Sequence, residues 1–323
     1  MSAAGHPPEP RTADGPSPPG AVPQVFPYQG SKRALAGRIL SLFPDGGVPR
    51  LVEPFAGSAA VSVAARHRGL ASAAHISDVN EPLMALWRLV IEDPRRLIDE
   101  YTRLWNEQLA DPRAYFLRTR AEFNATKRPE LLLYLLCRCV KAAVRYSRRT
   151  GEFNQGADHR RLGARPGNMA DRIRRTSVTM RGSAVTTGGY EDALVGAEPE
   201  ALVYLDPPYQ GTSGAPDHRY LRGLRRDSFA EVLQRAVDNK VSFVVSYDMV
   251  TEDNTYGLAL PGELGLTHRH VVAGTSSQAT LVGRRRVTVE SLYISPALLA
   301  RLGGAGALDG RLGLEPAAPG PGP

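Results

Sequence analysis

The sequence has 323 residues, 42% of them hydrophobic and 23% charged, a composition that excludes a fibrous or largely disordered protein. It contains no run of about eighteen uncharged apolar residues and no basic, apolar leader, so we expect a cytoplasmic protein with no membrane partner. The formal net charge is +7, and residues 113–186 hold 17 Lys and Arg against 5 Asp and Glu, which indicates a local site for a polyanion.

Both ends of the chain are biased in composition. Residues 1–23 are rich in Pro, Gly and Ala, and residues 303–323 are similar. Such segments bury too little apolar surface to order themselves, so we predict disordered tails. The main domain is then expected to comprise residues 24–93 and 186–302, with residues 94–185 forming an insert.

Apolar runs and helical patterns alternate along the main domain, which predicts an α/β fold with a mainly parallel sheet. Expected helices cover residues 59–69, 81–89 and 229–239, and expected strands include the apolar runs at 51–52, 201–205 and 241–246. Residues 286–295 alternate in polarity and predict an antiparallel edge strand.

The insert is expected to be helical and basic. Residues 129–147 predict one helix with an apolar stripe. Arg138, Lys141, Arg145 and Arg148 follow one another at spacings of 3, 4 and 3, which would place them on one helix face. A solvated charged face is the alternative, but it would be expected to contain interleaved Asp or Glu. We therefore expect these cations to contact phosphates.

Two cysteines, Cys137 and Cys139, also lie in this predicted helix. Two thiols separated by one residue cannot frame a disulfide scaffold or complete a zinc site. We expect them to be reduced helix residues, and we expect no metal site in the chain.

A small-residue turn, Glu53 to Ala59 (EPFAGSA), follows a predicted strand and precedes a predicted helix. Its small side chains would let a ligand approach the backbone closely. Asp78 ends the next predicted strand, about 20 residues further on, where an acidic residue typically binds ribose hydroxyls. By themselves these features are equally typical of an NAD-dependent oxidoreductase.

The tetrapeptide Asp206-Pro207-Pro208-Tyr209 directly follows the apolar run at 201–205. At the carboxyl end of a parallel strand it would face the crevice in which α/β folds bind ligands. The two prolines stiffen the turn and remove two backbone donors, which leaves carbonyl acceptors. If the Asp206 carboxylate and the Pro207 carbonyl accept the hydrogens of an adenine amino group, they orient its nitrogen toward a methyl donor. Tyr209 would offer a ring on which the base stacks.

A third motif, Tyr28-Gln29-Gly30-Ser31-Lys32, lies near the start of the expected fold. Its Gly-Ser-Lys sequence lacks the GxxxxGK[ST] spacing of a phosphate loop, which excludes a P-loop NTPase.

Taken together, YQGSKR, VEPFAGSAAV, ISDVN and DPPY resemble motifs of the Dam-type family of DNA adenine methyltransferases, over roughly residues 25–297. The segments RAEFN (120–124) and RTGEFN (149–154) are similar to those that flank the family's target-recognition region. The order of donor loop, recognition insert and DPPY is that of the α arrangement. One departure is Ala59, where the family usually has a second glycine.

The resemblance implies a Rossmann-like methyltransferase sheet, a helical DNA-recognition insert and S-adenosylmethionine as the methyl donor. The catalytic residues would be Asp206, Pro207, Pro208 and Tyr209. Residues expected to bind the donor are Tyr28, Gly30, Lys32, Glu53, Phe55, Gly57, Asp78 and Asn80. Residues expected to contact DNA are Arg138, Lys141, Arg145, Arg148, Arg149, Arg284 and Arg285.

The expected function is site-specific methylation of the adenine amino group in double-stranded DNA, with the base flipped out of the duplex. We also expect that the enzyme associates with the nucleoid and that it could belong to a restriction-modification system with a cognate endonuclease. An RNA adenine methyltransferase is the alternative within this class. An NAD-dependent oxidoreductase would leave DPPY unexplained, and a non-catalytic DNA-binding protein would leave both strand-end turns unexplained.

Overall fold

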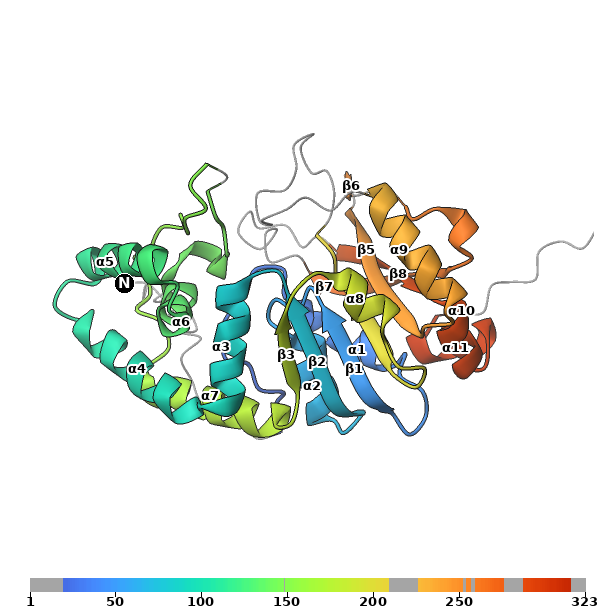
Figure 1. The fold of residues 1–323 in the computed structure, drawn as a ribbon, viewed down its shortest axis with the longest axis horizontal. Helices are drawn as coiled ribbons and strands as arrows, with labels where there is room; N and C mark the ends of the chain where they lie inside the picture. Colours follow the sequence, from blue (N-terminus) through green and yellow to red (C-terminus); the bar gives the residue numbers. More distant parts are fainter. Residues whose placement is uncertain are drawn as a thin grey trace, which may run out of the picture.

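A mixed β-sheet forms the centre of the computed structural model, which describes residues 20–147, 149–208, 226–251, 254–256, 259–275 and 287–314. Its strand order is β3-β2-β1-β4-β5-β8-β7, with β6 paired to β5 (Figure 1). The strands are β1 Val48–Pro54, β2 Ala71–Asp78, β3 Ala184–Thr187, β4 Leu202–Leu205, β5 Phe243–Thr251, β6 Asn254–Tyr256, β7 Thr267–Thr275 and β8 Val287–Ile294.

Strands β3, β2, β1, β4 and β5 pair in parallel, whereas β6, β8 and β7 pair in antiparallel fashion. The predicted α/β class, with a mainly parallel sheet and an antiparallel edge, is therefore confirmed. The position of β8 differs from the prediction, because β8 lies between β5 and β7 and the edge strand is β7. The polar start of β7, His268-Arg269-His270, carries no apolar alternation that would have predicted a strand.

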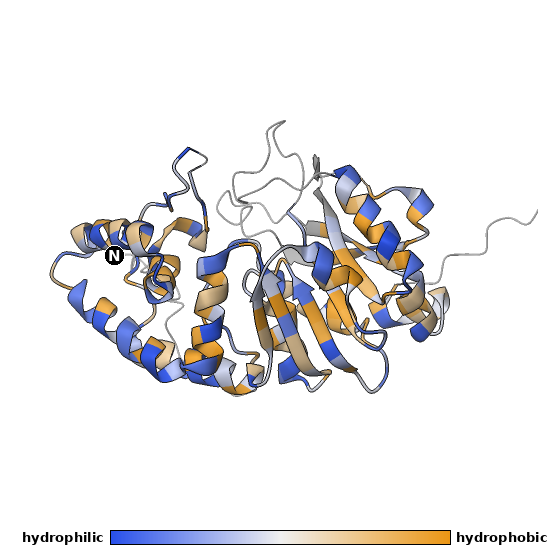
Figure 2. Ribbon diagram, viewed as in Figure 1, coloured by the Kyte–Doolittle hydropathy of each residue, from blue (hydrophilic) through white to orange (hydrophobic). Residues whose placement is uncertain are grey.

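Helices cover both faces of the sheet, and hydrophobic residues concentrate where strands and helices meet (Figures 1 and 2). One face packs against α1, α2, α10 and α11, and the other against α8 and α9. The helices of this part are η1 Lys32–Ala34, α1 Ala36–Leu40, α2 Ala60–His67, α3 Glu81–Glu92, α8 Tyr190–Val195, α9 Arg226–Asp238, η3 Gly262–Leu264, α10 Pro296–Arg301 and α11 Ala305–Leu312.

Alternate residues of β4 serve the two faces, as the period of a strand requires. Val203 and Leu205 pack with the α9 side, whereas Leu202 and Tyr204 pack with the α2 side. Residues that continue the Tyr204 side of β4 therefore face η1 and α2. The parallel pairing also brings the carboxyl ends of β1, β2 and β4 to one edge of the sheet.

The predicted insert, residues 94–185, contains four α-helices and the start of β3, and it lies beside α3 on the left of Figure 1. Its elements are α4 Pro94–Glu107, α5 Pro112–Thr126, α6 Pro129–Arg138, η2 Val140–Ala142 and α7 Pro166–Met180. Asp93 and Asp111 each cap a helix whose first residue is proline, a pairing that satisfies an exposed backbone donor and fixes the first φ. Its core is continuous with α3.

The predicted helix over residues 129–147 is wrong in its second half, because α6 ends at Arg138. The chain returns at residues 156–158, where Asp158 N–H donates to Arg138 O and Val140 N–H donates to Gly156 O. Lys141 and Ala142 then take left-handed φ values of 58° and 49°. The backbone groups that would continue the helix are thus paired with the returning chain.

The predicted tails are wrong where the structure describes them. Residues 305–312 form α11, whose Leu308 and Leu312 are buried in the sheet-facing core. At the other end, Ala21 O and Val22 O accept hydrogen bonds from Arg175 and Arg33 at 2.6 and 2.5 Å. Residues 1–19 and 315–323 lie outside the described part of the chain.

Candidate active site

The turn after β1 is held in an unusual backbone shape. Phe55, Gly57 and Ala59 have φ values of 61°, 48° and 45°, so the chain alternates through the left-handed region before α2 begins at Ala60. A Cβ at Gly57 would lie 2.9 Å from Tyr28 Cε1, so glycine is required there. Ala59 keeps the left-handed conformation in spite of its methyl group, which is fully buried. We call residues 54–59 the donor loop.

Asp78 fastens the donor loop to the end of β2. Its Oδ2 accepts a hydrogen bond of 3.2 Å from Gly57 N–H, and its Oδ1 accepts one of 3.0 Å from Asn80 N–H. On the other side of the loop, Trp87 Nε1 donates to Gly57 O at 3.0 Å. Burial raises the pKa of the Asp78 carboxyl, and the backbone donors oppose that rise. Both peptide groups of Gly57 are therefore fixed by residues outside the loop.

An open pocket with about 430 Å³ of empty space, part of it continuous with solvent, lies above this loop. Seven of the eight residues predicted to bind the donor line it: Tyr28, Gly30, Lys32, Glu53, Phe55, Gly57 and Asp78. Five other residues of the same two motifs also line it, and their role was not predicted from the sequence: Gln29, Ser31, Ala56, Ser58 and Ala60.

Asn80, the eighth predicted residue, does not line this pocket. Its side chain instead caps α3, where Oδ1 accepts from Leu83 N–H at 3.3 Å. The same oxygen accepts from the Tyr146 hydroxyl at 3.2 Å. Asn80 thus contributes to the site through its backbone N–H, which orients Asp78.

Glu53 lies at the floor of the pocket with its carboxyl buried. Oε2 accepts a hydrogen bond of 2.7 Å from Ser62 N–H in the first turn of α2. Burial raises the pKa of Glu53 to about 7, and the hydrogen bonds from Ser62 and Val61 only partly offset it. Glu53 therefore joins the end of β1 to α2 and exchanges its proton near neutral pH.

Asp206 reaches the same pocket from the carboxyl end of β4, the parallel neighbour of β1. Its Oδ1 lies 3.4 Å from Lys32 Nζ, and its side chain stays about one-fifth exposed. Pro207 and Pro208 are buried behind it. Tyr209 lies outside the described residues, so its predicted stacking role stays a prediction from the sequence.

Lys32 carries the positive charge of the pocket. Burial alone would lower its pKa, but the charges of Asp206 and Glu290 outweigh burial and raise the pKa well above its ordinary value. Glu290, on β8, lies at 2.7 Å from Lys32 Nζ. Glu290 was not among the predicted site residues.

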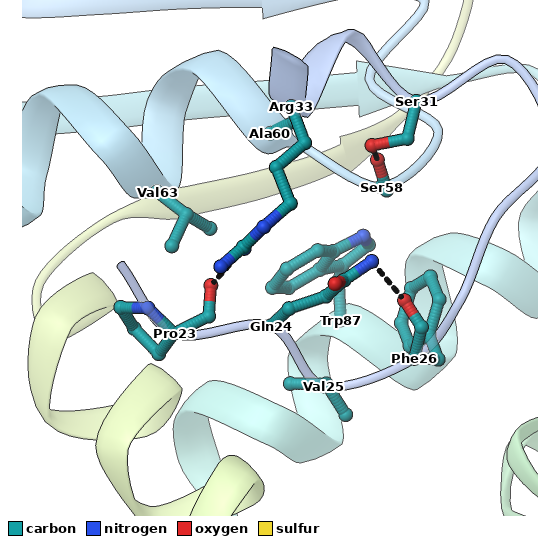
Figure 3. A pocket seen from close by; sticks show the side chains of 10 residues that line it. All are labelled: Pro23, Gln24, Val25, Phe26, Ser31, Arg33, Ser58, Ala60, Val63 and Trp87. Atoms are coloured by element: carbon teal, nitrogen blue, oxygen red, sulfur yellow. Dashed lines mark hydrogen bonds between the residues drawn. The ribbon is translucent and has the colours of Figure 1, made fainter. Parts of the chain in front are cut away.

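A second, smaller pocket, with about 280 Å³ of empty space that is partly open to solvent, lies behind the donor loop, between the segment 23–26 and Trp87 (Figure 3). Arg33 donates to Pro23 O at 3.2 Å across it, and Ser58 Oγ donates to Ser31 Oγ at 2.8 Å at its border with the first pocket. The N-terminal segment therefore supports the donor loop from behind.

The predicted DNA-binding residues lie in different environments. Arg138 is buried, with 1% of its surface exposed, and donates to Gln108 Oε1, so its assignment as a phosphate contact is wrong. Its guanidinium is held in the insert core because α6 ends there. Lys141 and Arg149 are exposed, and Arg145 is half-buried. Arg148, Arg284 and Arg285 lie outside the described residues.

Lys141, Arg145 and Arg149 belong to the segment Cys139–Ala157, which we call the basic hairpin. Antiparallel bridges join Cys139 to Ala157 and Tyr146 to Phe153. Its Ala142 O accepts from Gln29 N–H at 3.0 Å, next to the donor pocket. The hairpin is therefore attached to the pocket lining rather than to a continuous helix.

In the described part of the chain, no group of three or more His, Cys, Asp or Glu residues is arranged to hold a metal ion. None of the helices described there has both the length and the apolar character needed to cross a bilayer.

The model of the D12 class N6 adenine-specific DNA methyltransferase family matches residues 28–277. The chain belongs to this family. It is 25% identical over 264 residues to the retron Ec67 DNA adenine methylase of Escherichia coli, covering 80% of this chain and 78% of the relative. It is also 25% identical over 198 residues to the type II methyltransferase M.MjaIII of Methanocaldococcus jannaschii, covering 57% and 68%. With a DNA adenine methylase of Salmonella typhi it shares 25% identity over 242 residues, covering 72% and 83%.

The match confirms the resemblance inferred from the motifs and shows that the protein is a DNA adenine methyltransferase enzyme with a Rossmann-like sheet. The two alternatives from other classes, an NAD-dependent oxidoreductase and a non-catalytic DNA-binding protein, are thereby set aside.

Proposed function

We propose that this D12-class enzyme transfers the methyl group of S-adenosylmethionine to the exocyclic amino group of adenine in double-stranded DNA. The observation that supports it most is that Asp206, Gly57 and Asp78 line one pocket, so the donor loop and the DPPY turn face the same space. Neither motif would carry this proposal alone, because donor-type loops and Pro-Pro turns each occur in other proteins.

The residues of the pocket fit this donor. Gly57 lines the pocket and has no Cβ, so a ligand can approach its backbone closely. The carboxylate of Asp78 accepts two backbone hydrogen bonds and has lone pairs left for ribose hydroxyls. Asp78 and Asp206 also give the pocket carboxylates that attract a positively charged sulfur. When bound, S-adenosylmethionine supplies a methyl group activated by that sulfur.

Asp206 and Pro207 would receive the adenine amino group. Each amino hydrogen needs an acceptor, and the Asp206 carboxylate and the Pro207 carbonyl are two neighbouring acceptors of the turn. Holding both hydrogens would orient the nitrogen lone pair toward the methyl carbon. In that transfer the nitrogen would bond to the methyl carbon as the carbon–sulfur bond breaks, the sulfur would leave as a neutral thioether, and the methylated amine would give one proton to solvent. A strong base is unnecessary, because the amine becomes acidic once methylated.

The basic hairpin would hold phosphates while the base is flipped into the pocket. Support comes from its position, since Ala142 contacts Gln29 at the pocket, and Lys141 and Arg149 are exposed on the same hairpin. We further propose that the enzyme acts in the cytoplasm on the nucleoid. A cognate restriction endonuclease would be a partner if the chain shares the setting of its relative named as a type II methyltransferase.

The test compares the unmodified protein with Asp206→Ala, which removes the side-chain acceptor, and with Asp238→Ala, a control at the exposed end of α9. Labelled S-adenosylmethionine is supplied with duplex DNA or with structured RNA. We expect transfer to DNA, a loss of about a hundredfold or more in kcat for Asp206→Ala, and no change for the control. Full activity of Asp206→Ala would overturn its catalytic role, and methylation of RNA alone would overturn the proposed substrate.

A further inference from the structure

Strand β8 carries a glutamate at a position where its neighbours are apolar. Glu290 is 6% exposed and shares one face of the strand with Leu292 and Ile294, which pack in the core beneath α1 and α2. A charge on such a strand is costly unless a partner compensates it. The buried Glu290 carboxylate therefore needs a positively charged partner, and that partner indicates its role.

The partner is Lys32. Its Nζ donates to both carboxylate oxygens of Glu290, at 2.7 and 2.8 Å. The same Nζ lies farther from Asp206, at 3.4 Å from Oδ1. Since β5 separates β4 from β8 in the sheet, the ammonium group bridges two strands that do not touch.

Other titratable groups face this ammonium from the elements around it. Tyr204 lies on β4 and shares a buried hydrogen bond of 3.0 Å with Ser246 of β5. Glu53 lies on β1, and the charge of Asp206 contributes to the raised pKa of its carboxyl. Lys32, Glu290, Asp206, Tyr204 and Glu53 thus form one polar layer between the sheet and η1.

We propose that Glu290 is a positioning residue for methyl transfer: it binds the Lys32 ammonium tightly and so keeps the Asp206 carboxylate available as an acceptor for the adenine amino group. The inference rests on the proposed function of Asp206. Its basis is the difference in distance, because the two short contacts to Glu290 and the longer one to Asp206 direct most of the ammonium's hydrogen bonding away from the catalytic carboxylate.

The consequence of removing the Glu290 charge follows from this geometry. In Glu290→Gln the buried ammonium loses the carboxylate that it contacts at 2.7 and 2.8 Å, and it pairs more closely with Asp206. That pairing occupies the acceptor that the amino group needs, so kcat falls at neutral pH. Loss of the Glu290 charge also lowers the pKa of Lys32, because burial is then opposed by fewer anions. At alkaline pH the lysine becomes neutral and releases Asp206.

The experiment measures kcat and the KM for duplex DNA from pH 6.5 to 9.5 for the unmodified enzyme, Glu290→Gln and Glu290→Asp. We expect Glu290→Gln to lose roughly tenfold or more in kcat at pH 7.5, with KM changed less than about threefold, and to recover as pH rises. Glu290→Asp, which keeps the charge, should restore much of kcat. A purely structural role would give a loss that does not recover with pH.

Two further measurements separate this proposal from the proposed function. If Glu290 acts through Lys32, then Glu290→Gln should cause no additional loss of kcat in a Lys32→Met background. Independently of activity, NMR of labelled lysine side chains should show Lys32 titrating at lower pH in Glu290→Gln than in the unmodified protein. An unchanged titration of Lys32, or additive losses in the double variant, would overturn the proposal. Absence of methylation by the unmodified enzyme would instead overturn the proposed function.

Discussion

The Tyr146 hydroxyl donates a hydrogen bond of 3.2 Å to Asn80 Oδ1, which links the basic hairpin to the residue that caps α3. The backbone N–H of Asn80 in turn donates to Asp78. On the opposite side of the pocket, Gln29 N–H donates to Ala142 O of the same hairpin. The hairpin proposed to bind DNA is therefore hydrogen-bonded to both sides of the proposed donor site.

Tyr146→Phe should weaken S-adenosylmethionine binding about threefold to tenfold, because one hydrogen bond that holds Asn80 beside Asp78 is lost. Isothermal titration with the donor measures this effect. Tyr115→Phe is the matched control, since it removes another insert hydroxyl, one that donates to Glu107 away from the pocket. Equal donor affinities in both variants would show that the Tyr146 contact does not reach the pocket.

Gly57→Ala should abolish donor binding, because the new methyl would collide with Tyr28 and the left-handed φ would be strained. Gly37→Ala is the matched control: its position in α1 is exposed, nothing lies within 4 Å, and the change should stabilise by about 0.5–1 kcal/mol. Donor titration and urea unfolding of both variants check these outcomes. Normal donor affinity in Gly57→Ala would show that the pocket tolerates the methyl and would count against its assignment.

Glu53 should make the stability of the fold depend on pH. Its pKa rises from 4.5 to about 7 on folding, so the folded chain binds more protons than the unfolded chain between these values. The free energy of unfolding should therefore fall as pH rises through this window, by roughly 3 kcal/mol over the whole shift.

Urea unfolding at pH 5 and pH 8 measures this dependence. Glu53→Gln, which stays neutral, should lose most of it, whereas Glu231→Gln, an exposed change on α9, should keep it. A Glu53→Gln variant with the pH dependence of the unmodified protein would show that Glu53 ionises normally.

Substitution of Arg149 should affect DNA binding, whereas substitution of Arg138 should affect the stability of the fold. Arg149→Ala should lower DNA affinity and reduce the slope of log affinity against log salt by about 0.9, as expected for one lost phosphate contact. Arg138→Met should leave that slope unchanged but lower the free energy of unfolding by about 2–3 kcal/mol, because the guanidinium is buried against Gln108. Fluorescence anisotropy at several salt concentrations and urea unfolding distinguish the two effects. A changed salt slope in Arg138→Met would return that residue to the DNA interface.

The donor loop and the DPPY turn were predictable because each combines a local motif with a preceding apolar strand. Strand–turn–helix order then places both at one sheet edge, whatever the long-range packing. Asp78 was found in the same way, from its spacing after Gly57 at the end of the next strand. The positions of these residues could therefore be predicted from the sequence immediately around them.

Glu290 and Arg138 could not be assigned because their roles depend on residues far away in the chain. Glu290 contacts Lys32, 258 residues away, and the sole local signal is one acidic residue within an alternating strand. The helical pattern in the sequence continues beyond Arg138, but the helix ends at Arg138 because residues 156–158 return and pair with the backbone there. Helix α11 was missed because four of its eight residues are Gly or Ala, and its buried side chains are the two leucines Leu308 and Leu312.

The seating of α11 has a practical consequence for expressing the enzyme. Arg269 pairs with Asp309 at 2.5 Å, and Arg311 donates to Phe43 O at 3.0 Å, so this last described helix is tied to β7 and to the turn before β1. An affinity tag or fluorescent reporter that replaces the chain after Gly303 would remove α11 and expose the apolar core residues that α11 covers. Such a fusion would aggregate, whereas a tag attached beyond Leu314 would leave α11 packed on the core.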